Sequence, residues 1–174
     1  GSYTLRPFFL SELAPLKQWS ALDGRSPREF LISKFLDREA ALVSRMVQVE
    51  TTAARRALGQ LFQEVALDMM DREADTVDLE YIKLLCQLVF EGVLSSEDIR
   101  LLQHKIGSTG LLESDAIPNH CRFPHSELQN HFLAHALLSS DSKDPVRRIL
   151  RRAIFGADFL QVFLEVCEEL PANI

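Results

Sequence analysis

Histidine is unusually concentrated in one part of this chain, because four of its five histidines fall within 16 positions, together with a cysteine. The residues are His120, Cys121, His125, His131 and His135. His131 and His135 are four positions apart, so on a helix both imidazoles project from one face. Imidazole nitrogen and thiolate sulfur are common zinc ligands. The sequence therefore offers a possible tetrahedral zinc site made of Cys121, His125, His131 and His135.

The same histidines have a simpler interpretation as residues at the edge of a hydrophobic core. On a helical wheel they flank an apolar stripe that contains Leu128 and Phe132. Their spacing matches no established zinc module, and no glutamate lies between His131 and His135 as in a metalloprotease helix. We therefore expect no cofactor and keep zinc as the alternative.

A basic ridge is the second feature that could bind a partner. It consists of Arg147, Arg148, Arg151 and Arg152. Aliphatic residues alternate with these arginines, so one face of a helix would be cationic and the other buried. Guanidinium groups bind carboxylates and phosphates, which predicts docking of an acidic or phosphorylated segment of a partner. Alternatively, the ridge pairs with acidic residues of the last helix, such as Glu165 and Glu168.

Three aromatic side chains near the amino terminus, Phe8, Phe9 and Trp19, form a third candidate feature. Large aromatic residues are usually buried, so they could pack onto the first helical hairpin. If they were exposed together, they would instead form an aromatic patch that anchors a partner.

Motifs that carry catalysis are missing from the sequence. It contains no glycine-rich phosphate loop, no nucleophile elbow and no zincin helix. His120 is adjacent to Cys121, and neighbouring residues seldom reach the geometry that activates a thiolate. We therefore expect that the protein is not an enzyme.

Helix start signals recur along the chain and predict the elements that would position these residues. At the first, Ser26 can cap a helix, Pro27 suits its first position, and the Glu29 carboxylate can reach back to the cap. This helix either continues to Met46 or is divided by a second cap at Asp37.

The clearest helical periodicity begins after Thr52. Its apolar stripe is Ala54, Leu58, Leu61, Phe62, Val65 and Met69. The next helix would be capped by Asp75 or Thr76, and a third would run from Ser95 to Gly107. Such short links make consecutive helices antiparallel neighbours.

Periodicity fades between Gly107 and Phe123, so we expect an irregular loop over 107–123. Helices resume at 124–138, after Asp144 and from Asp158 onward, and strand signals hardly appear. The fold class is therefore predicted as all-α, with about seven or eight helices in an antiparallel helical-hairpin bundle or a short HEAT-like array. The prediction is a single helical domain over 3–174, preceded by Gly1 and Ser2, which resemble a cloning remnant.

Composition limits the function further. Hydrophobic residues make up 47% of 174 residues and the formal charge is −6, which disfavours a nucleic-acid-binding surface. Three widely spaced cysteines predict free thiols and therefore an intracellular protein, cytoplasmic or nuclear. No apolar run is long enough to span a bilayer, so we expect no membrane contact.

These observations predict a protein–protein interaction or scaffold module, one domain of a larger intracellular protein. A partner peptide or subunit would bind an inter-helix groove and the basic ridge. The alternatives are a zinc-stabilised helical domain and a weak nucleic-acid-binding module. The oligomeric state stays open.

Overall fold

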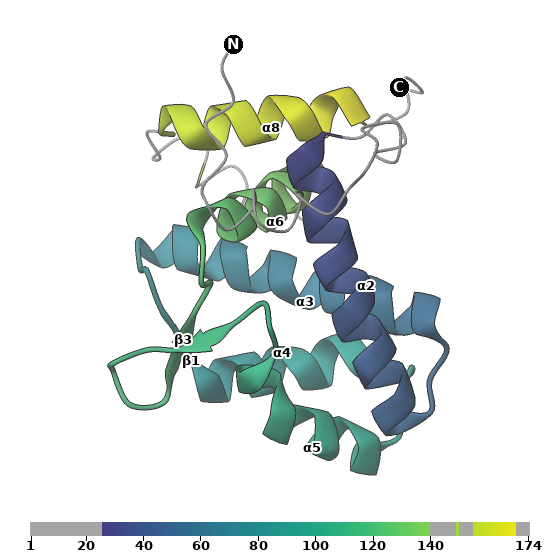
Figure 1. The fold of residues 1–174 in the computed structure, drawn as a ribbon. Coiled ribbons are helices and arrows are strands. Elements are labelled where there is room, and N and C mark those ends of the chain that lie inside the picture. Colours follow the sequence, from purple (N-terminus) through teal and green to yellow (C-terminus); the bar gives the residue numbers. More distant parts are fainter. Residues whose placement is uncertain (1–25, 140–148, 150–154, 170–174) are drawn as a thin grey trace.

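The computed structural model describes residues 26–139, 149 and 155–169, and these residues are mostly helical (Figure 1). The α-helices are α2 (Pro27–Val47), α3 (Thr51–Arg72), α4 (Leu79–Phe90), α5 (Ser96–Lys105), α6 (Ser126–Ser139) and α8 (Ala157–Glu169). The broad prediction of a helical fold is confirmed. Six helices lie within the described residues, fewer than the seven or eight expected, and of the predicted helix after Asp144 only Ile149 is described, where it is helical. None of the described helices is long and apolar enough to cross a membrane.

Helix α2 begins where the sequence predicts. The Ser26 hydroxyl accepts a hydrogen bond from the Glu29 amide at 3.1 Å, and a proline follows the cap. The helix continues unbroken past Asp37, which therefore does not cap a second helix. Instead the Asp37 carboxylate pairs with Arg55 of α3, with 2.5 Å between Oδ1 and Nε. This ion pair links the two helices of the first hairpin.

Helix α3 lies at the centre of the fold and buries the whole predicted stripe. In Figure 1 α6 lies between α3 and α8, and α2 runs across the stack. Phe62 of α3 and Phe132 of α6 join these layers, with ring centroids 5.3 Å apart. The buried hydrophobic residues form one cluster, so α6 is held firmly on α3.

The segment 107–123 is largely irregular, but it also contains regular elements that the sequence does not predict. It contains a 3-10 turn, η2 (Ile106–Ser108), and two strands, β2 (Glu113–Ser114) and β3 (His120–Arg122). Strand β3 pairs antiparallel with β2 and with β1 (Val77–Asp78), giving the order β1-β3-β2. Such short strands leave no alternating pattern in a sequence, which explains why the prediction missed them.

Helix α4 also begins later than predicted. Its cap is Asp78, which accepts a hydrogen bond from the Glu80 amide at 2.7 Å, and neither Asp75 nor Thr76 serves. A turn that includes Gly92, with φ 82°, leads from α4 to α5. Residues 77–122 therefore form two short helices bordered by a three-stranded sheet, and we call them the β1–β3 unit.

Candidate functional site

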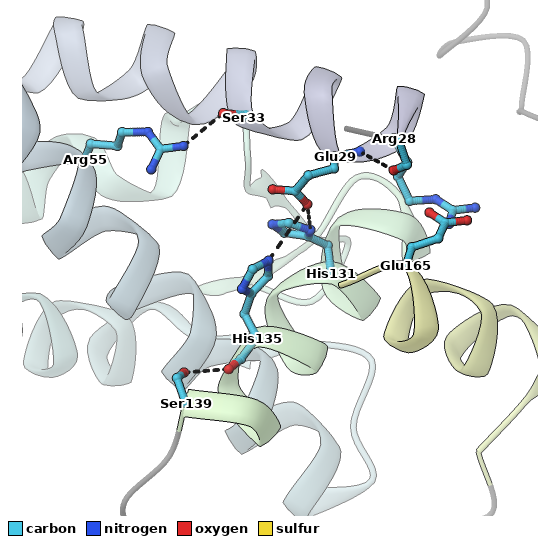
Figure 2. Close-up of polar contacts among 9 residues, drawn as sticks. Arg28, Glu29, Ser33, Arg55, His131, His135, Ser139 and Glu165 are labelled. Atoms are coloured by element: carbon cyan, nitrogen blue, oxygen red, sulfur yellow. Dashed lines mark hydrogen bonds and ion pairs between the residues drawn. The ribbon is translucent and has the colours of Figure 1, made fainter. Parts of the chain in front are cut away.

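Three polar side chains from two helices converge beside α3. Glu29 extends from α2 and the histidines His131 and His135 extend from α6, so that all three point toward one another (Figure 2). Glu29 Oε2 lies 2.9 Å from His131 Nδ1 and 3.8 Å from His135 Nε2. The two imidazole rings are 4.4 Å apart between centroids. We call these three residues the Glu29 triad.

Local sequence explains how each member is placed. The cap at Ser26 fixes the first turn of α2, and Glu29 lies in that turn. One turn of α6 separates the two histidines, which therefore share a face. Arg28 extends instead to α8, where its Nη1 lies 2.7 Å from Glu165 Oε2 (Figure 2). Consecutive residues of α2 thus bind two different helices, which fixes the start of α2 against both.

The Glu29 triad is largely shielded from solvent. The exposed fractions of the side chains are 17% for Glu29, 8% for His131 and 32% for His135. Burial alone would raise the pKa of Glu29, but the hydrogen bond with His131 and the proximity of both imidazoles outweigh it and hold that pKa well below its usual range. Burial also lowers the pKa of His131, despite the opposing effect of Glu29. Contact with the histidines therefore favours the ionised form of Glu29, whereas burial favours the uncharged form of His131.

One nitrogen of the Glu29 triad has no hydrogen-bond partner. His135 Nε2 is buried, and the carboxylate oxygen Glu29 Oε2 lies 3.8 Å away, beyond hydrogen-bond distance, although the ring is partly open to solvent. An unsatisfied buried polar atom costs free energy, so its presence calls for a ligand or a functional explanation.

A pocket of about 560 Å³ opens beside the Glu29 triad. Besides the triad it is lined by Leu36, Arg55, Arg56, Gly59, Gln60, Gln63, Glu64, Leu67, Phe132, Ala136 and Ser139. Arg55 is already engaged, since Nη2 donates to the Ser33 hydroxyl at 2.9 Å (Figure 2). Burial raises the pKa of Glu64. The volume is in the range of small-molecule sites, and the lining mixes polar and apolar groups.

Only part of the predicted metal set comes together. His131 and His135 meet, but the third donor near them is Glu29, and these are the residues whose donor atoms lie within 4.8 Å of one another among the described residues. Cys121 is buried in β3 and pairs with both neighbouring strands, and His125 precedes α6 at an intermediate exposure. The sequence missed Glu29 because its position beside a cap suggested a purely local role.

The interpretation of these histidines as core-edge residues also has structural support. His131 is buried, with its ring 5.1 Å from that of Phe132. A histidine can pack at the edge of the core and still present its Nδ1 to a carboxylate. The placement of His131 is therefore compatible both with a core-edge residue and with a metal ligand.

Other predicted site residues lie outside the described part of the chain. They are Phe8, Phe9, Trp19, Arg147, Arg148, Arg151 and Arg152. One acidic residue that could have paired with the basic ridge, Glu165, forms an ion pair with Arg28. The roles predicted for the aromatic patch and the ridge remain predictions.

The three cysteines are free. Burial raises the pKa of Cys86 to about 12, and it also raises the pKa of Cys121. A thiol reacts as its thiolate, so neither buried cysteine is poised as a nucleophile. The pairing of His120 with Cys121 gains no support either, because His120 Nδ1 lies 3.0 Å from the Pro118 carbonyl oxygen.

Comparisons with protein-family models, with curated proteins and with solved structures found no match to this chain.

Proposed function

We propose that this chain is a protein-interaction module and that a protein partner docks on the β1–β3 unit. The observation that carries the proposal is a concentration of exposed apolar side chains there. Of the nine large hydrophobic residues exposed among the described residues, five belong to this unit. They are Leu84, Leu88, Val93, Leu101 and Ile117, which are 42–59% exposed. Exposed apolar patches are typical of surfaces that bind proteins, and these five residues are the candidates for such a patch.

Helix α4 supplies the most exposed pair of this set. Leu84 and Leu88 are four residues apart and are 52% and 59% exposed, so they form one apolar stripe on the outer face. The opposite face of α4 buries Ile82, Leu85 and Phe90 in the core. The helix is thus anchored from behind, which presents the two leucines on a rigid support.

The connectivity of this region also favours a recognition role. A helix, α3, is followed by β1, α4, α5 and the β2–β3 hairpin, and the short turn with Gly92 that joins α4 to α5 is similar to that of a helix-turn-helix. In DNA-binding helix-turn-helix proteins, the amino-terminal residues of the second helix contact bases. Here the corresponding helix α5 carries Glu97 and Asp98 in its first turn.

Charge makes a protein partner the better interpretation. The β1–β3 unit contains four Lys or Arg residues against seven Asp or Glu residues. Arg122 of the hairpin is held by Glu113, with 2.8 Å between Nε and Oε1, and is not free for a phosphate. Binding to a phosphate backbone needs the opposite balance. We therefore favour a partner with an apolar anchor and a basic rim over nucleic acid.

The test is capture of partners by the full chain from a cell lysate, measured by quantitative mass spectrometry. Replacing Leu84 and Leu88 together with serine should reduce recovery of the specific partner about 10-fold or more, since central anchors dominate interface energy. Leu160 and Leu164 of α8 provide the matched control, because they have the same spacing and are 48% and 62% exposed. Serine at those two positions should leave recovery unchanged.

Equal recovery by wild type and by the α4 double variant would contradict docking on the β1–β3 unit. The same assay with Arg148→Glu and Arg151→Glu asks whether the basic ridge contributes selectivity for an acidic or phosphorylated segment. Loss of binding only in that variant would move the interface to the ridge.

A further inference from the structure

We propose that Glu29, His131 and His135 form a zinc-binding site between α2 and α6. The inference is independent of protein docking on the β1–β3 unit, because it uses different residues on different helices. It also differs from the metal set that the sequence suggests, because a carboxylate replaces Cys121 and His125.

The chemistry of the donors selects the class of metal. Two imidazole nitrogens and one carboxylate oxygen are a ligand set that zinc accepts, whereas magnesium and calcium prefer oxygen alone. Two histidines four residues apart on a helix supply ligands on one face, and a third ligand from another helix completes a triangular set. Ferrous iron also binds two histidines and one carboxylate, so its binding is compared in the same titration.

The distances among the donor atoms suit one small cation. Zinc lies about 2.0–2.2 Å from nitrogen and oxygen ligands, so tetrahedral ligand atoms are ~3.4 Å apart. The two separations from Glu29 Oε2, 2.9 Å to His131 Nδ1 and 3.8 Å to His135 Nε2, lie on either side of that value. All three donors lie within 4.8 Å of one another, so small side-chain rotations bring them to one ion.

The unpaired nitrogen provides a second, independent reason. His135 Nε2 is buried without a hydrogen-bond partner, and it faces the same carboxylate oxygen that contacts His131 (Figure 2). Among the described residues, Glu29 forms no ion pair with a lysine or arginine. The neighbouring Arg28 binds Glu165 instead. A divalent cation would satisfy the nitrogen and neutralise the buried carboxylate together.

The site also has access and a place for a further ligand. His135 is 32% exposed and borders the 560 Å³ pocket, so a metal ion can enter from that side. Three protein ligands leave the fourth tetrahedral position for water or for an atom of a bound small molecule.

Titration of the full chain, without an affinity tag and after treatment with a chelator, tests the proposal. Cobalt absorption and zinc competition should show one ion per chain, and ferrous iron should bind more weakly than zinc, as expected from their general order of affinity. Glu29→Gln and His135→Gln should each weaken zinc binding by about 100-fold or more, since even indirect supports of a ligand are worth about 10–100-fold. The matched control is His125→Gln, which should bind zinc like wild type.

Several results would overturn the proposal. Wild type that binds no stoichiometric zinc, or a Glu29→Gln variant that binds as tightly as wild type, excludes the site. A loss in His125→Gln equal to that in His135→Gln would place the metal on the predicted Cys121–His135 set instead.

Circular dichroism would reveal a variant that fails to fold. A measurement on the wild-type chain tests the site without relying on any variant. Imidazole nitrogen chemical shifts, recorded by NMR before and after adding zinc, should show coordination by His131 Nδ1 and His135 Nε2. Unchanged shifts at these two nitrogens would also refute the site.

Discussion

One carboxylate oxygen, Glu29 Oε2, contacts an imidazole that is almost fully buried and faces a second one. An isolated carboxylate would be costly at this depth, and contact with the histidines offsets that cost. The Glu29 triad is therefore a place where the charge state of single residues influences the stability of the fold. The stability of the folded chain should depend on pH in a direction set by the lowered pKa values of Glu29 and His131.

We predict that the free energy of unfolding falls as the pH drops. The pKa of His131 lies below its ordinary value of 6.5, so protonation favours the unfolded chain, and its contribution is lost as the pH falls from 6.5 toward the folded-state pKa. The pKa of Glu29 is also lowered, so its contribution is present above 4.5 and is lost at more acidic pH. Both effects have the same sign.

Urea unfolding at a series of pH values, with metal removed, measures this dependence. Each unit of pKa difference corresponds to about 1.4 kcal/mol at full titration. Glu29→Gln should flatten the curve below pH 4.5. A wild-type stability that stays constant from pH 7 to pH 4 would contradict the prediction.

At the scale of single elements, helix starts are set by capping side chains. Ser26, Asp78 and Ser95 each accept a hydrogen bond from an amide of the first turn. These caps determine where α2, α4 and α5 begin, and hence which faces of the helices meet the core. The start of α2 has a further consequence, because it fixes the direction of Glu29.

The cap of α5 provides a direct test. Ser95→Ala removes the acceptor that lies 3.2 Å from the Asp98 amide, and it should lower the free energy of unfolding by about 1 kcal/mol. Ser96→Ala is the neighbouring control, because Ser96 is exposed and follows the cap. Urea unfolding distinguishes the two variants, and equal stabilities would show that the cap contributes nothing.

At the scale of the whole molecule, aromatic packing holds the layers together. Phe62 of α3, Phe132 of α6 and Phe123, which follows β3, form a cluster with centroid distances of 5.3–6.4 Å. The cluster connects the helical layers to the β1–β3 unit. It also lies directly behind His131, so the position of the candidate metal site depends on it.

Truncation of Phe132 should therefore affect the whole fold. Phe132→Ala is expected to cost about 3–5 kcal/mol of unfolding free energy, because it leaves a cavity in a fully packed core. Leu160→Ala, at a side chain that is 48% exposed, should cost much less. Calorimetry or urea unfolding measures both, and a similar small loss in the two variants would contradict a central role for the cluster.

Local chemistry along the sequence was sufficient to predict much of the helical framework. Caps at Ser26 and Ser95, the stripe from Ala54 to Met69 and the final helix near Asp158 depend on residues within a few positions of one another. The positions of these helices can therefore be predicted from the sequence alone. The same holds for His131 and His135, whose shared face follows from their spacing.

Tertiary structure alone decided the sheet and the candidate site. Strands of two or three residues exist because β3 pairs with distant partners, and no local pattern specifies that pairing. Glu29 joins the two histidines because α2 and α6 both pack against α3, which places residues far apart in the chain within hydrogen-bond distance. The sequence by itself determined where most of the described helices form and that His131 and His135 share a face, and packing decided that a carboxylate of α2 lies beside them.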